Sequence, residues 1–365
     1  MSYLERARAQ LAQIDGLHRR RSIETRPSAD AIDFSGNDYL ALSHEPQVVE
    51  ALRRARSVGS GGSRLLGGRH REYYLLEEEL AQWLGRERAL LFSSGYHAAI
   101  GVAPTIGDLV DRLDSDELNH ACWIDGMRLS RTPRAIYAHA RPPIGDGRPR
   151  AIVTESLFSM DGDAIEVGRY RSLLAAHDVL ILDEAHALGV LGPRGAGLAA
   201  GVDDERILVM GTLSKSFGCF GGFVAGASDA IELLVNRARS FIFDTAMPPA
   251  LATAARVSLM LLAGELGDRR RAHLRELYAH LHAGLASLGL ASSAEFSPIV
   301  PIVLGSEERA LAVAAKLREG RIEAPAIRPP TVPRGSSRLR LSLRADHRKE
   351  HVDLLIERLA RATTT

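Results

Sequence analysis

Short runs of apolar residues alternate with longer amphipathic stretches between about residue 50 and residue 245. The apolar runs have the length of buried strands, and the stretches between them repeat with the period of helices. This alternation predicts a mostly parallel sheet covered by helices, which is an α/β fold. The predicted strands are 89–92, 151–156, 179–183, 207–211 and 221–226, and the helix-like segments include 74–85 and 168–177.

The pattern changes after residue 245, where two long helical patterns precede a series of strand, helix, strand and helix. The segments of this tail are 250–264, 269–289, 299–305, 308–320, 337–343 and 347–362. This order predicts a smaller α+β lobe. We therefore predict an N-terminal arm over 1–45, a large domain over 46–265 and a small C-terminal domain over 266–365.

Composition limits the possible classes of function. The chain has 365 residues, of which 45% are hydrophobic and 25% charged, as in an ordinary globular protein. Its 46 basic and 45 acidic side chains give a formal net charge of +1, which predicts no field for binding nucleic acid. No stretch reaches the roughly 20 apolar residues of a membrane span. The charged N-terminus and the two cysteines predict a cytoplasmic protein without disulfides or a secretory signal.

Lys215 stands out among the basic residues, because the chain has three lysines and 43 arginines. It lies in GTLSKSFG (211–218), directly after the apolar run 207–210. An amine that follows a buried strand among small residues is poorly placed for a surface charge and well placed for a Schiff base. The other two lysines, Lys316 and Lys349, lie in helical or charged segments with a solvated face.

A second predicted strand, VLILD (179–183), ends at Asp183 and is followed by His186. An acid after a buried strand is often only a helix cap, so Asp183 alone has two interpretations. With Lys215 at a neighbouring strand end, however, an acid, an imidazole and an amine are expected at one edge of the sheet. This set is what pyridoxal 5′-phosphate (PLP) needs, since its ring is an electron sink only while a carboxylate keeps the ring nitrogen protonated.

A phosphate group is bound by backbone N–H groups at a helix N-terminus and by small hydroxyls. The segment FSSGYHAAIG (92–101) has a strand end followed by a helix start, and Thr212 adds a hydroxyl three residues before Lys215. A Ser-Gly pair after a strand is also found in ordinary tight turns. The candidate phosphate-binding residues are Ser94, Gly95, Tyr96 and Thr212.

His120, in SDELNHACWIDG (115–126), is the candidate for an aromatic plate over the cofactor ring. A lone histidine is more often a satisfied structural residue, so its position alone leaves both interpretations open. The glycine-rich segment 59–68 resembles a phosphate cradle, but such a loop is a weak signal, and we interpret it as flexible backbone near the site.

The motif DEAH (183–186) also occurs in nucleic-acid helicases, whose acids hold Mg²⁺. Such enzymes need a G-x-x-x-x-G-K-[ST] loop, and one that ended on Lys215 would require glycine at positions 209 and 214. The chain has Val209 and Ser214 there, which disfavours an ATPase, although a nucleotide-dependent nucleic-acid remodeller stays the rival class. No H-E-x-x-H motif or Cys/His pair spacing predicts a metal site.

Eight segments, in this order and spacing, resemble the α-oxoamine synthases, a family of fold-type I PLP enzymes. The resemblance covers nearly the whole chain and implies a large, mostly parallel α/β/α domain with a smaller α+β C-terminal domain. The last segment favours the branch of the family that acts in biotin biosynthesis. The segments are 34–46, 58–68, 115–126, 154–163, 182–192, 212–218, 243–250 and 327–343.

The resemblance implies roles for the residues at the cofactor. Lys215 would bind the cofactor covalently, Asp183 would face the ring nitrogen, and His120 would stack on the ring. His186 and Ser159 would contact the phenolate side of the ring. The phosphate would be bound by Gly95, Tyr96 and Thr212, and by Thr245 from the neighbouring subunit of a homodimer.

The resemblance also implies the substrates of an acyltransferase. Arg340 would bind the carboxylate of the amino acid, and Thr331 and an arginine of 19–21, for which we choose Arg19, would contact substrate. The implied reaction condenses L-alanine with pimeloyl-CoA or its acyl-carrier protein thioester and releases CO₂ and the free thiol. The alternative is a sibling enzyme that uses glycine or another amino acid with a different acyl-CoA.

The chain departs from the family pattern at a few positions. Glu184 stands where the family commonly has aspartate, and Ala41 stands where it commonly has glycine. Ser214 replaces the glycine that often precedes the lysine in the biotin branch, and the segment 138–150 is shorter than usual. None of these positions is a candidate PLP residue.

Overall fold

A computed structural model describes residues 1–21, 23, 30–291 and 295–363. Its contacts divide the chain into two compact units, each of which is described by itself. The larger unit comprises Asn37–Ser159 and Asp163–Ala272, and the smaller comprises Met1–Gly36, Met160–Gly162 and His273–Thr365. The predicted boundaries at residues 45 and 265 stay predictions, and the predicted arm includes residues 22 and 24–29, which lie outside the described residues.

The larger unit is built on a seven-stranded sheet with the strand order β2-β8-β7-β6-β5-β3-β4. Only β8 runs antiparallel to its neighbours, which confirms the predicted mostly parallel α/β fold. The strands are β2 (Arg88–Phe92), β3 (Arg112–Asp116), β4 (Arg134–Tyr137), β5 (Arg150–Glu155), β6 (Val179–Asp183), β7 (Ile207–Thr212) and β8 (Gly222–Gly226). All five apolar runs form strands, while β3 and β4 were not among the predicted strands.

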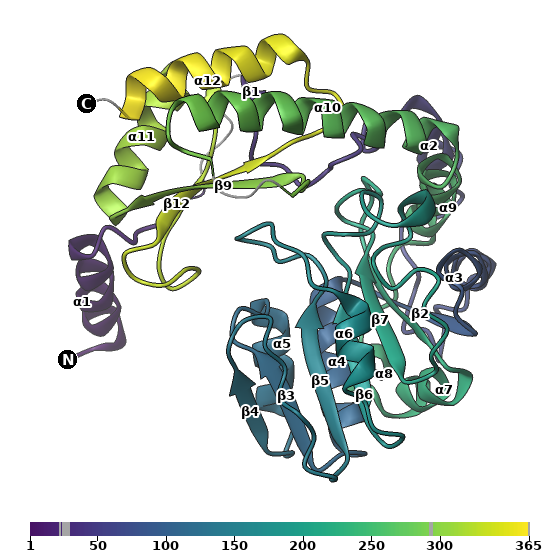
Figure 1. Ribbon diagram of the computed structural model, residues 1–365. Helices are drawn as coiled ribbons and strands as arrows, with labels where there is room; N and C mark the ends of the chain where they lie inside the picture. Colours follow the sequence, from purple (N-terminus) through teal and green to yellow (C-terminus); the bar gives the residue numbers. More distant parts are fainter. Residues whose placement is uncertain (22, 24–29, 292–294, 364–365) are drawn as a thin grey trace. The chain divides into compact units, whose positions relative to one another are not determined.

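Helices flank both faces of this sheet, with α6 drawn in front of it and α4 behind it in Figure 1. The helices of the larger unit are α2 (Pro46–Arg53), α3 (Arg71–Leu84), α4 (Gly95–Gly107), α5 (Ala121–Leu129), α6 (Val167–Ser172), α7 (Ser228–Arg237), α8 (Arg239–Ile242) and α9 (Pro249–Leu262), with a 3₁₀ turn, η1 (Pro193–Gly195). Helix α10 (Glu265–Ser287) begins in this unit and continues into the smaller one. Helix α6 ends at Ser172, five residues before the end of the predicted pattern.

The core of the larger unit lies between the sheet and the helices α4, α5, α7 and α8. Val102, Trp123 and Ile181 are fully buried there, together with further apolar side chains from β2, β3, β5, β7 and β8. Burying each large apolar side chain stabilises the fold by roughly 1.5–3 kcal/mol. This packing fixes the strands, and their carboxyl ends therefore form a rigid edge on which polar residues can be placed.

The smaller unit has two small sheets covered by helices, as the alternation in the C-terminal third predicts. Its elements are α1 (Tyr3–Gly16), β1 (Ile32–Asp33), β9 (Ile299–Gly305), α11 (Glu307–Glu319), β10 (Ile322–Glu323), β11 (Ala326–Ile327), β12 (Ser337–Ser342) and α12 (Lys349–Thr363). Strand β12 lies between β11 and β9 in one sheet, and β1 pairs with β10 in the other. The arm is thereby tied to the C-terminal part of the chain through the pairing of Ile32 with Ile322.

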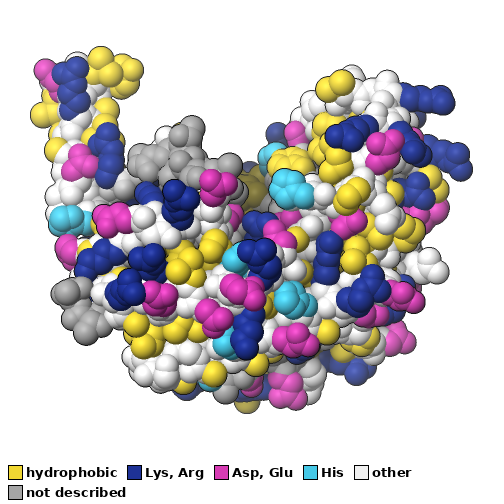
Figure 2. Space-filling view, turned by 90° about the horizontal axis from the view of Figure 1, so that it is seen from above, with side chains coloured by type: hydrophobic (Ala, Val, Ile, Leu, Met, Phe, Trp, Pro, Cys, Tyr) yellow, Lys and Arg dark blue, Asp and Glu magenta, His cyan; other side chains and the backbone are white. Residues whose placement is uncertain are grey.

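No single helix within the described residues is both long and apolar enough to cross a membrane, although α9 and α10 together meet the criterion as a pair bent by 67°. On the face shown in Figure 2, basic and acidic side chains are intermixed rather than gathered by sign. This distribution agrees with the near-zero net charge of the chain.

Candidate active site

Lys215 lies on a tight loop that follows β7. Backbone hydrogen bonds close this loop, from Leu213 N–H to the Gly221 carbonyl and from Gly218 N–H to the Lys215 carbonyl, at 2.9 and 2.8 Å. Gly218 has a φ of +62°, and a Cβ there would lie 2.2 Å from the backbone nitrogen of Ser43. Only glycine fits such a conformation and such a close approach. The loop that carries the amine is therefore held in one place.

Two acids end the adjacent strands β5 and β6. Glu155 and Asp183 are partners in the parallel register, and both are buried. The carboxylate of Asp183 accepts hydrogen bonds from the Trp123 indole N–H at 2.8 Å and from Ala185 N–H at 2.9 Å. Each carboxylate oxygen has two lone pairs, so this side chain retains the capacity to accept a further donor such as a ring N–H.

Burial raises the pKa of Glu155 well above its usual range, and the negative charge of Asp183 raises it further. Two carboxylates at one site cannot both ionise without a large cost. Lys215 opposes this effect electrostatically, as do the hydrogen bonds that Glu155 accepts from the backbone N–H groups of His120 and Ser159, at 2.7 and 3.2 Å. Burial and the charge of Asp183 outweigh these opposing effects, and the net shift of the Glu155 pKa is upward.

His120 caps the N-terminus of α5, because its Nδ1 accepts a hydrogen bond from Cys122 N–H at 3.3 Å. The residue is exposed overall, but the surrounding protein desolvates the imidazole and lowers its pKa. Lys215 lowers the pKa of His120 as well, and Asp183 opposes both effects. A neutral, solvent-accessible ring beside the amine and the acid is suited to stacking on an aromatic cofactor.

His186 and Ser159 are both buried at the same edge of the sheet. The Nδ1 atom of His186 lies 2.7 Å from the Tyr39 hydroxyl, which also donates to the side-chain oxygen of Asn37 at 3.2 Å. This contact fixes the plane of the imidazole. Ser159 lies on the segment after β5 and is held through its backbone N–H to Glu155.

The N-terminus of α4 forms a cradle of small residues. Ser94 caps the helix by accepting a hydrogen bond from His97 N–H at 3.1 Å. A Cβ on Gly222 would lie 2.4 Å from the backbone nitrogen of Gly95, and a Cβ on Gly95 would lie 3.5 Å from the Thr212 Cβ. The structure therefore brings Gly95 and Thr212 together where exposed backbone N–H groups favour an anion.

The hydroxyl groups of Thr212, Tyr96 and Thr245 differ in their surroundings. Thr212 donates to the Gly221 carbonyl at 3.0 Å and lies 2.8 Å from the Ser214 hydroxyl, so its oxygen is already tied to the Lys215 loop. The Tyr96 hydroxyl points to α5 and donates to Asp125 at 2.5 Å. Thr245 is exposed, on a segment held to the glycine-rich loop by a hydrogen bond from Ala246 N–H to the Gly62 carbonyl at 3.0 Å.

These residues fit PLP by the chemistry of their donor groups. Lys215 supplies an amine, Asp183 a buried carboxylate, His120 an exposed ring, and the N-terminus of α4 a cradle for an anion. The electrostatic influence of Lys215 reaches His120, Glu155 and Cys122, which places the amine among them. No group of three histidine, cysteine or acidic residues that could hold a metal ion occurs in the described part of the chain.

The three predicted substrate residues belong to the smaller unit. Arg340, on β12, is buried and donates to the Ser342 hydroxyl at 2.8 Å. Arg19 forms an ion pair with Glu307 at 3.1 Å, whereas Arg21 donates to the Thr331 hydroxyl at 3.2 Å. Of the arginine run 19–21, Arg21 is therefore the residue whose side chain meets Thr331.

Sequence reasoning missed three residues of the candidate site: Glu155, Trp123 and Tyr39. Glu155, Trp123 and Tyr39 lie inside segments that carry the family resemblance, so a signal for them was present without a role attached to it. Only the tertiary structure shows that Trp123 donates to Asp183 and that Tyr39 meets His186.

Two departures from the family motifs have clear structural settings. Ala41 has a φ of +53°, in the left-handed region that favours glycine. Glu184 is fully buried and accepts hydrogen bonds from the Ser156 hydroxyl at 2.6 Å and from the backbone N–H groups of Leu198 and Ala199 at 3.1 and 2.7 Å. The carboxylate of Glu184 thus anchors a structural loop.

Comparison with known proteins agrees with this geometry. Residues 29–359 match the family model for aminotransferase class I and II, so the chain belongs to the aminotransferase class I and II family. The chain is 44% identical to 8-amino-7-oxononanoate synthase from Anaeromyxobacter dehalogenans, with 96% of this chain and 94% of the relative covered. It is 43% identical to the enzyme of the same name from Cellvibrio japonicus, with 89% and 84% covered.

Solved structures confirm the fold class. Serine palmitoyltransferase from Sphingomonas wittichii superimposes with a TM-score of 0.91 at 26% identity, covering 100% of this chain and 98% of that one. 8-Amino-7-oxononanoate synthase from Francisella tularensis superimposes with a TM-score of 0.81 at 28% identity, covering 92% of this chain and 99% of that one. Both kinds of relative belong to the family that the sequence motifs resemble, the α-oxoamine synthases.

Proposed function

We propose that the chain carries out the reaction of 8-amino-7-oxononanoate synthase, a PLP-dependent acyl transfer in biotin biosynthesis. It condenses L-alanine with a pimeloyl thioester and yields 8-amino-7-oxononanoate, CO₂ and the free thiol. The observation that carries this conclusion is the 44% identity between this chain and a relative of that name, over nearly the full length of both. The residues of the candidate site also fit PLP. The cofactor is PLP, and the enzyme is an acyltransferase.

The roles of individual residues are part of the proposal. Lys215 would bind the cofactor through its amine, and Asp183 would pair with the ring nitrogen. His120 would stack on one face of the ring, while His186 and Ser159 would contact its phenolate side. Gly95, Tyr96 and Thr212 would hold the phosphate, with the backbone N–H groups at the start of α4 as the main donors.

Proton transfer is the step that the protein's own residues perform. When bound, PLP supplies an electron sink for negative charge at the α-carbon of the amino acid. The Lys215 amine would act as general base and remove the Cα proton of alanine. Asp183 would be the carboxylate partner of the ring nitrogen, and burial favours the protonated form of Glu155 beside it.

Substrate binding is assigned to the smaller unit. Arg340 would bind the alanine carboxylate, since a guanidinium pairs with a carboxylate through two parallel hydrogen bonds. Thr331 would contact substrate together with an arginine of the run 19–21. We propose Arg21 rather than Arg19 as the arginine that contacts substrate, because Arg21 donates to Thr331 and Arg19 is paired with Glu307.

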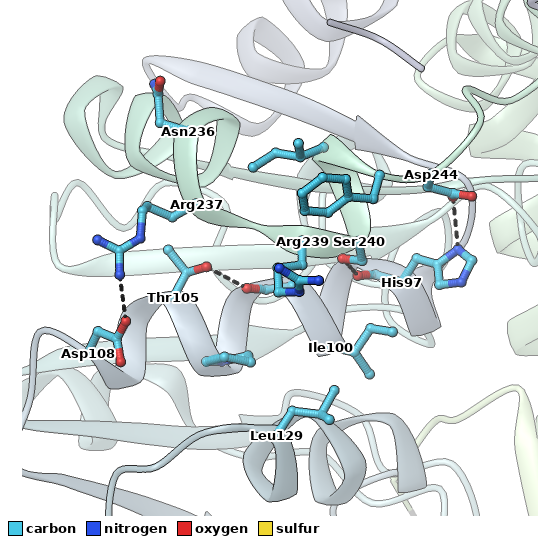
Figure 3. A pocket seen from close by; sticks show the side chains of 14 residues that line it. His97, Ile100, Thr105, Asp108, Leu129, Asn236, Arg237, Arg239, Ser240 and Asp244 are labelled. Carbon is cyan, nitrogen blue, oxygen red and sulfur yellow. Dashed lines mark hydrogen bonds and ion pairs between the residues drawn. The ribbon is translucent and has the colours of Figure 1, made fainter. Parts of the chain in front are cut away.

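A homodimer is proposed in which Thr245 serves the neighbouring subunit's phosphate. A groove of about 870 Å³ beside Thr245 supports this assembly; helices α4, α7 and α8 line it, and Figure 3 shows its side chains. Phe243 and Leu129, on its walls, are 70% and 63% exposed. An exposed apolar surface of this kind is suited to a protein interface. A cytoplasmic location stays a prediction.

A thiol-release assay tests which acyl group the enzyme accepts. Purified protein loaded with PLP is given L-alanine or glycine with CoA thioesters of graded chain length and with a pimeloyl carrier-protein thioester. We expect the largest kcat/KM with L-alanine and pimeloyl. Turnover with short acyl groups and none with pimeloyl would favour the sibling α-oxoamine synthase, for which Ser214 before the lysine is the supporting feature.

The Lys215→Ala variant tests the site itself. We expect a folded protein that lacks the yellow absorbance of the loaded enzyme and has lost at least about 10³-fold in kcat, since both the covalent link and the general base are gone. The absorbance spectrum and the thiol-release rate are the measurements, with Lys316→Ala on α11 as the matched control. Normal turnover by the Lys215 variant would refute the assignment.

A further inference from the structure

His139 links two loops that carry candidate cofactor residues: the His120 loop, residues 117–120, and the Ser159 loop, residues 156–159. His139 itself lies in neither loop. It follows β4, and its imidazole lies between Asp116, the last residue of β3, and Asp163, which closes the segment after β5. The Nδ1 atom lies 3.1 Å from Asp116 Oδ1, and the Nε2 atom lies 2.7 Å from Asp163 Oδ2. The ring also packs edge-on against Phe158, with centroids 4.4 Å apart.

Each of the two acids shapes a loop that carries a cofactor residue. Asp116 accepts a hydrogen bond from Leu118 N–H at 2.9 Å, within the segment that leads to His120. Asp163 holds the other segment through its carbonyl, which accepts from Phe158 N–H at 2.9 Å, next to Ser159. A group that binds both acids therefore sets the distance between the His120 loop and the Ser159 loop.

The bonding pattern requires an imidazolium. A neutral imidazole has one N–H and can donate to one carboxylate only, whereas the protonated ring donates from both nitrogens. Hydrogen bonds to Asp116 and Asp163 raise the pKa of His139 to about 10, against a smaller effect of burial. Glu117 is the other charged side chain that contacts this residue, since its carboxylate accepts from His139 N–H at 2.9 Å.

We propose that His139 is a positioning residue, an imidazolium clamp that holds the His120 and Ser159 loops at the spacing required by the cofactor ring. Glu155 joins the same two loops from inside the sheet edge, through the backbone N–H groups of His120 and Ser159. The loops are thus tied twice, by a buried carboxyl group on one side and by a cation on the other. This inference rests on the proposed roles of His120 and Ser159.

Loss of the clamp is expected to weaken cofactor binding rather than to remove a reacting group. His139→Gln keeps one donor and loses the charge, so we expect the PLP dissociation constant to rise about tenfold, the effect of losing one charge-assisted hydrogen bond. His139→Arg keeps a cation with several donors and should recover most of the affinity. His177→Gln is the matched control, at a histidine after α6 whose side chain is 42% exposed against 25% for His139, and should bind PLP as the wild type does.

Two further readouts separate positioning from general stability. Deuterium exchange of the full chain without cofactor should become faster at residues 117–120 and 156–159 in His139→Gln, and should stay unchanged in α3. The difference in PLP affinity between wild type and His139→Gln should be constant around neutral pH and should disappear as the pH rises through about 10, where the wild-type imidazolium is lost. The two proteins share every other titratable group, so the difference isolates His139.

If His139→Gln does not fold, Asp163→Asn replaces it, because this variant removes one carboxylate of the clamp and leaves the Asp116 bond. Equal PLP affinity and equal exchange in wild type and in a folded clamp variant would overturn the clamp and leave the proposed function standing. Failure of the wild type itself to bind PLP would instead overturn the proposed function.

Discussion

The two ends of strand β5 hold buried charges in opposite ways. At its amino end Arg150 is 1% exposed, and its guanidinium lies 3.2 Å from Asp178 and 3.2 Å from Asp114. Two further donors of Arg150 reach the carbonyls of Pro143 and Leu173 at 2.7 and 3.1 Å. At the carboxyl end Glu155 is equally buried, but the acid beside it on the next strand, Asp183, carries the same sign of charge.

This contrast distinguishes a buried charge that stabilises the fold, Arg150, from buried acids that are suited to a bound group, Glu155 and Asp183. At the amino end the protein supplies all the compensation itself, as buried ion pairs must if they are not to destabilise the fold. At the carboxyl end the protein leaves two acids facing one region that also holds Lys215. A strongly perturbed acid such as Glu155 is typical of functional sites, where a bound group completes the charge balance. A protonated ring nitrogen would do so here.

The largest expected effect is at the structural end. Arg150→Met would leave Asp114 and Asp178 buried without their shared cation, and the loss of one partner of a buried pair costs about 3–5 kcal/mol. Denaturant unfolding of the variant should show this loss, while kcat of the folded fraction should stay near the wild-type value. Arg148→Met, at an exposed arginine two residues earlier, is the matched control and should leave stability unchanged. Equal stability of Arg150→Met and wild type would remove the contrast between the two strand ends.

The next effect is at the functional end. Asp183→Asn keeps the shape of the side chain but removes the charge, and loss of one preorganised electrostatic partner lowers kcat by about 10²–10³-fold. The thiol-release rate at saturating alanine is the measurement. Glu184→Gln, at the neighbouring acid that anchors Leu198 and Ala199, should lower stability more than kcat. If the two variants lost kcat equally, Asp183 would have no special role.

The smallest effect concerns Glu155. Its raised pKa means that the folded protein binds a proton which the unfolded chain has already released, so wild-type stability falls as the pH rises from about 4.5 towards the folded-state pKa. Glu155→Gln is neutral at all pH values and avoids this loss. We expect the cofactor-free variant to be nearly as stable as wild type at pH 4.5 and to gain on it at higher pH. A constant difference in unfolding free energy across pH 4.5–8 would contradict the raised pKa.

The sequence predicted the site best where chemistry follows an apolar run. Lys215, Asp183 and Gly95 lie at or just after strands β7, β6 and β2, and the pattern alone located those strand ends. Strand β3 escaped prediction because it is rich in polar residues, and β4 escaped it because its apolar run is only three residues long. Asp114 and Asp116 are buried on β3 only because arginine and histidine partners meet them there, as in the bond from Arg112 to Asp114 at 2.6 Å.

The sequence by itself determined the α/β layering and the family and supplied the candidate cofactor residues, since period, strand ends and ordered motifs are local properties of the chain. Only the tertiary structure decided which groups face one another: Glu155 beside Asp183, His139 between two loops, and Arg21 rather than Arg19 at Thr331. The physical reason is that strand register and loop closure join residues 23 to 310 positions apart, and the energies of burial and pairing that set their protonation arise at those contacts.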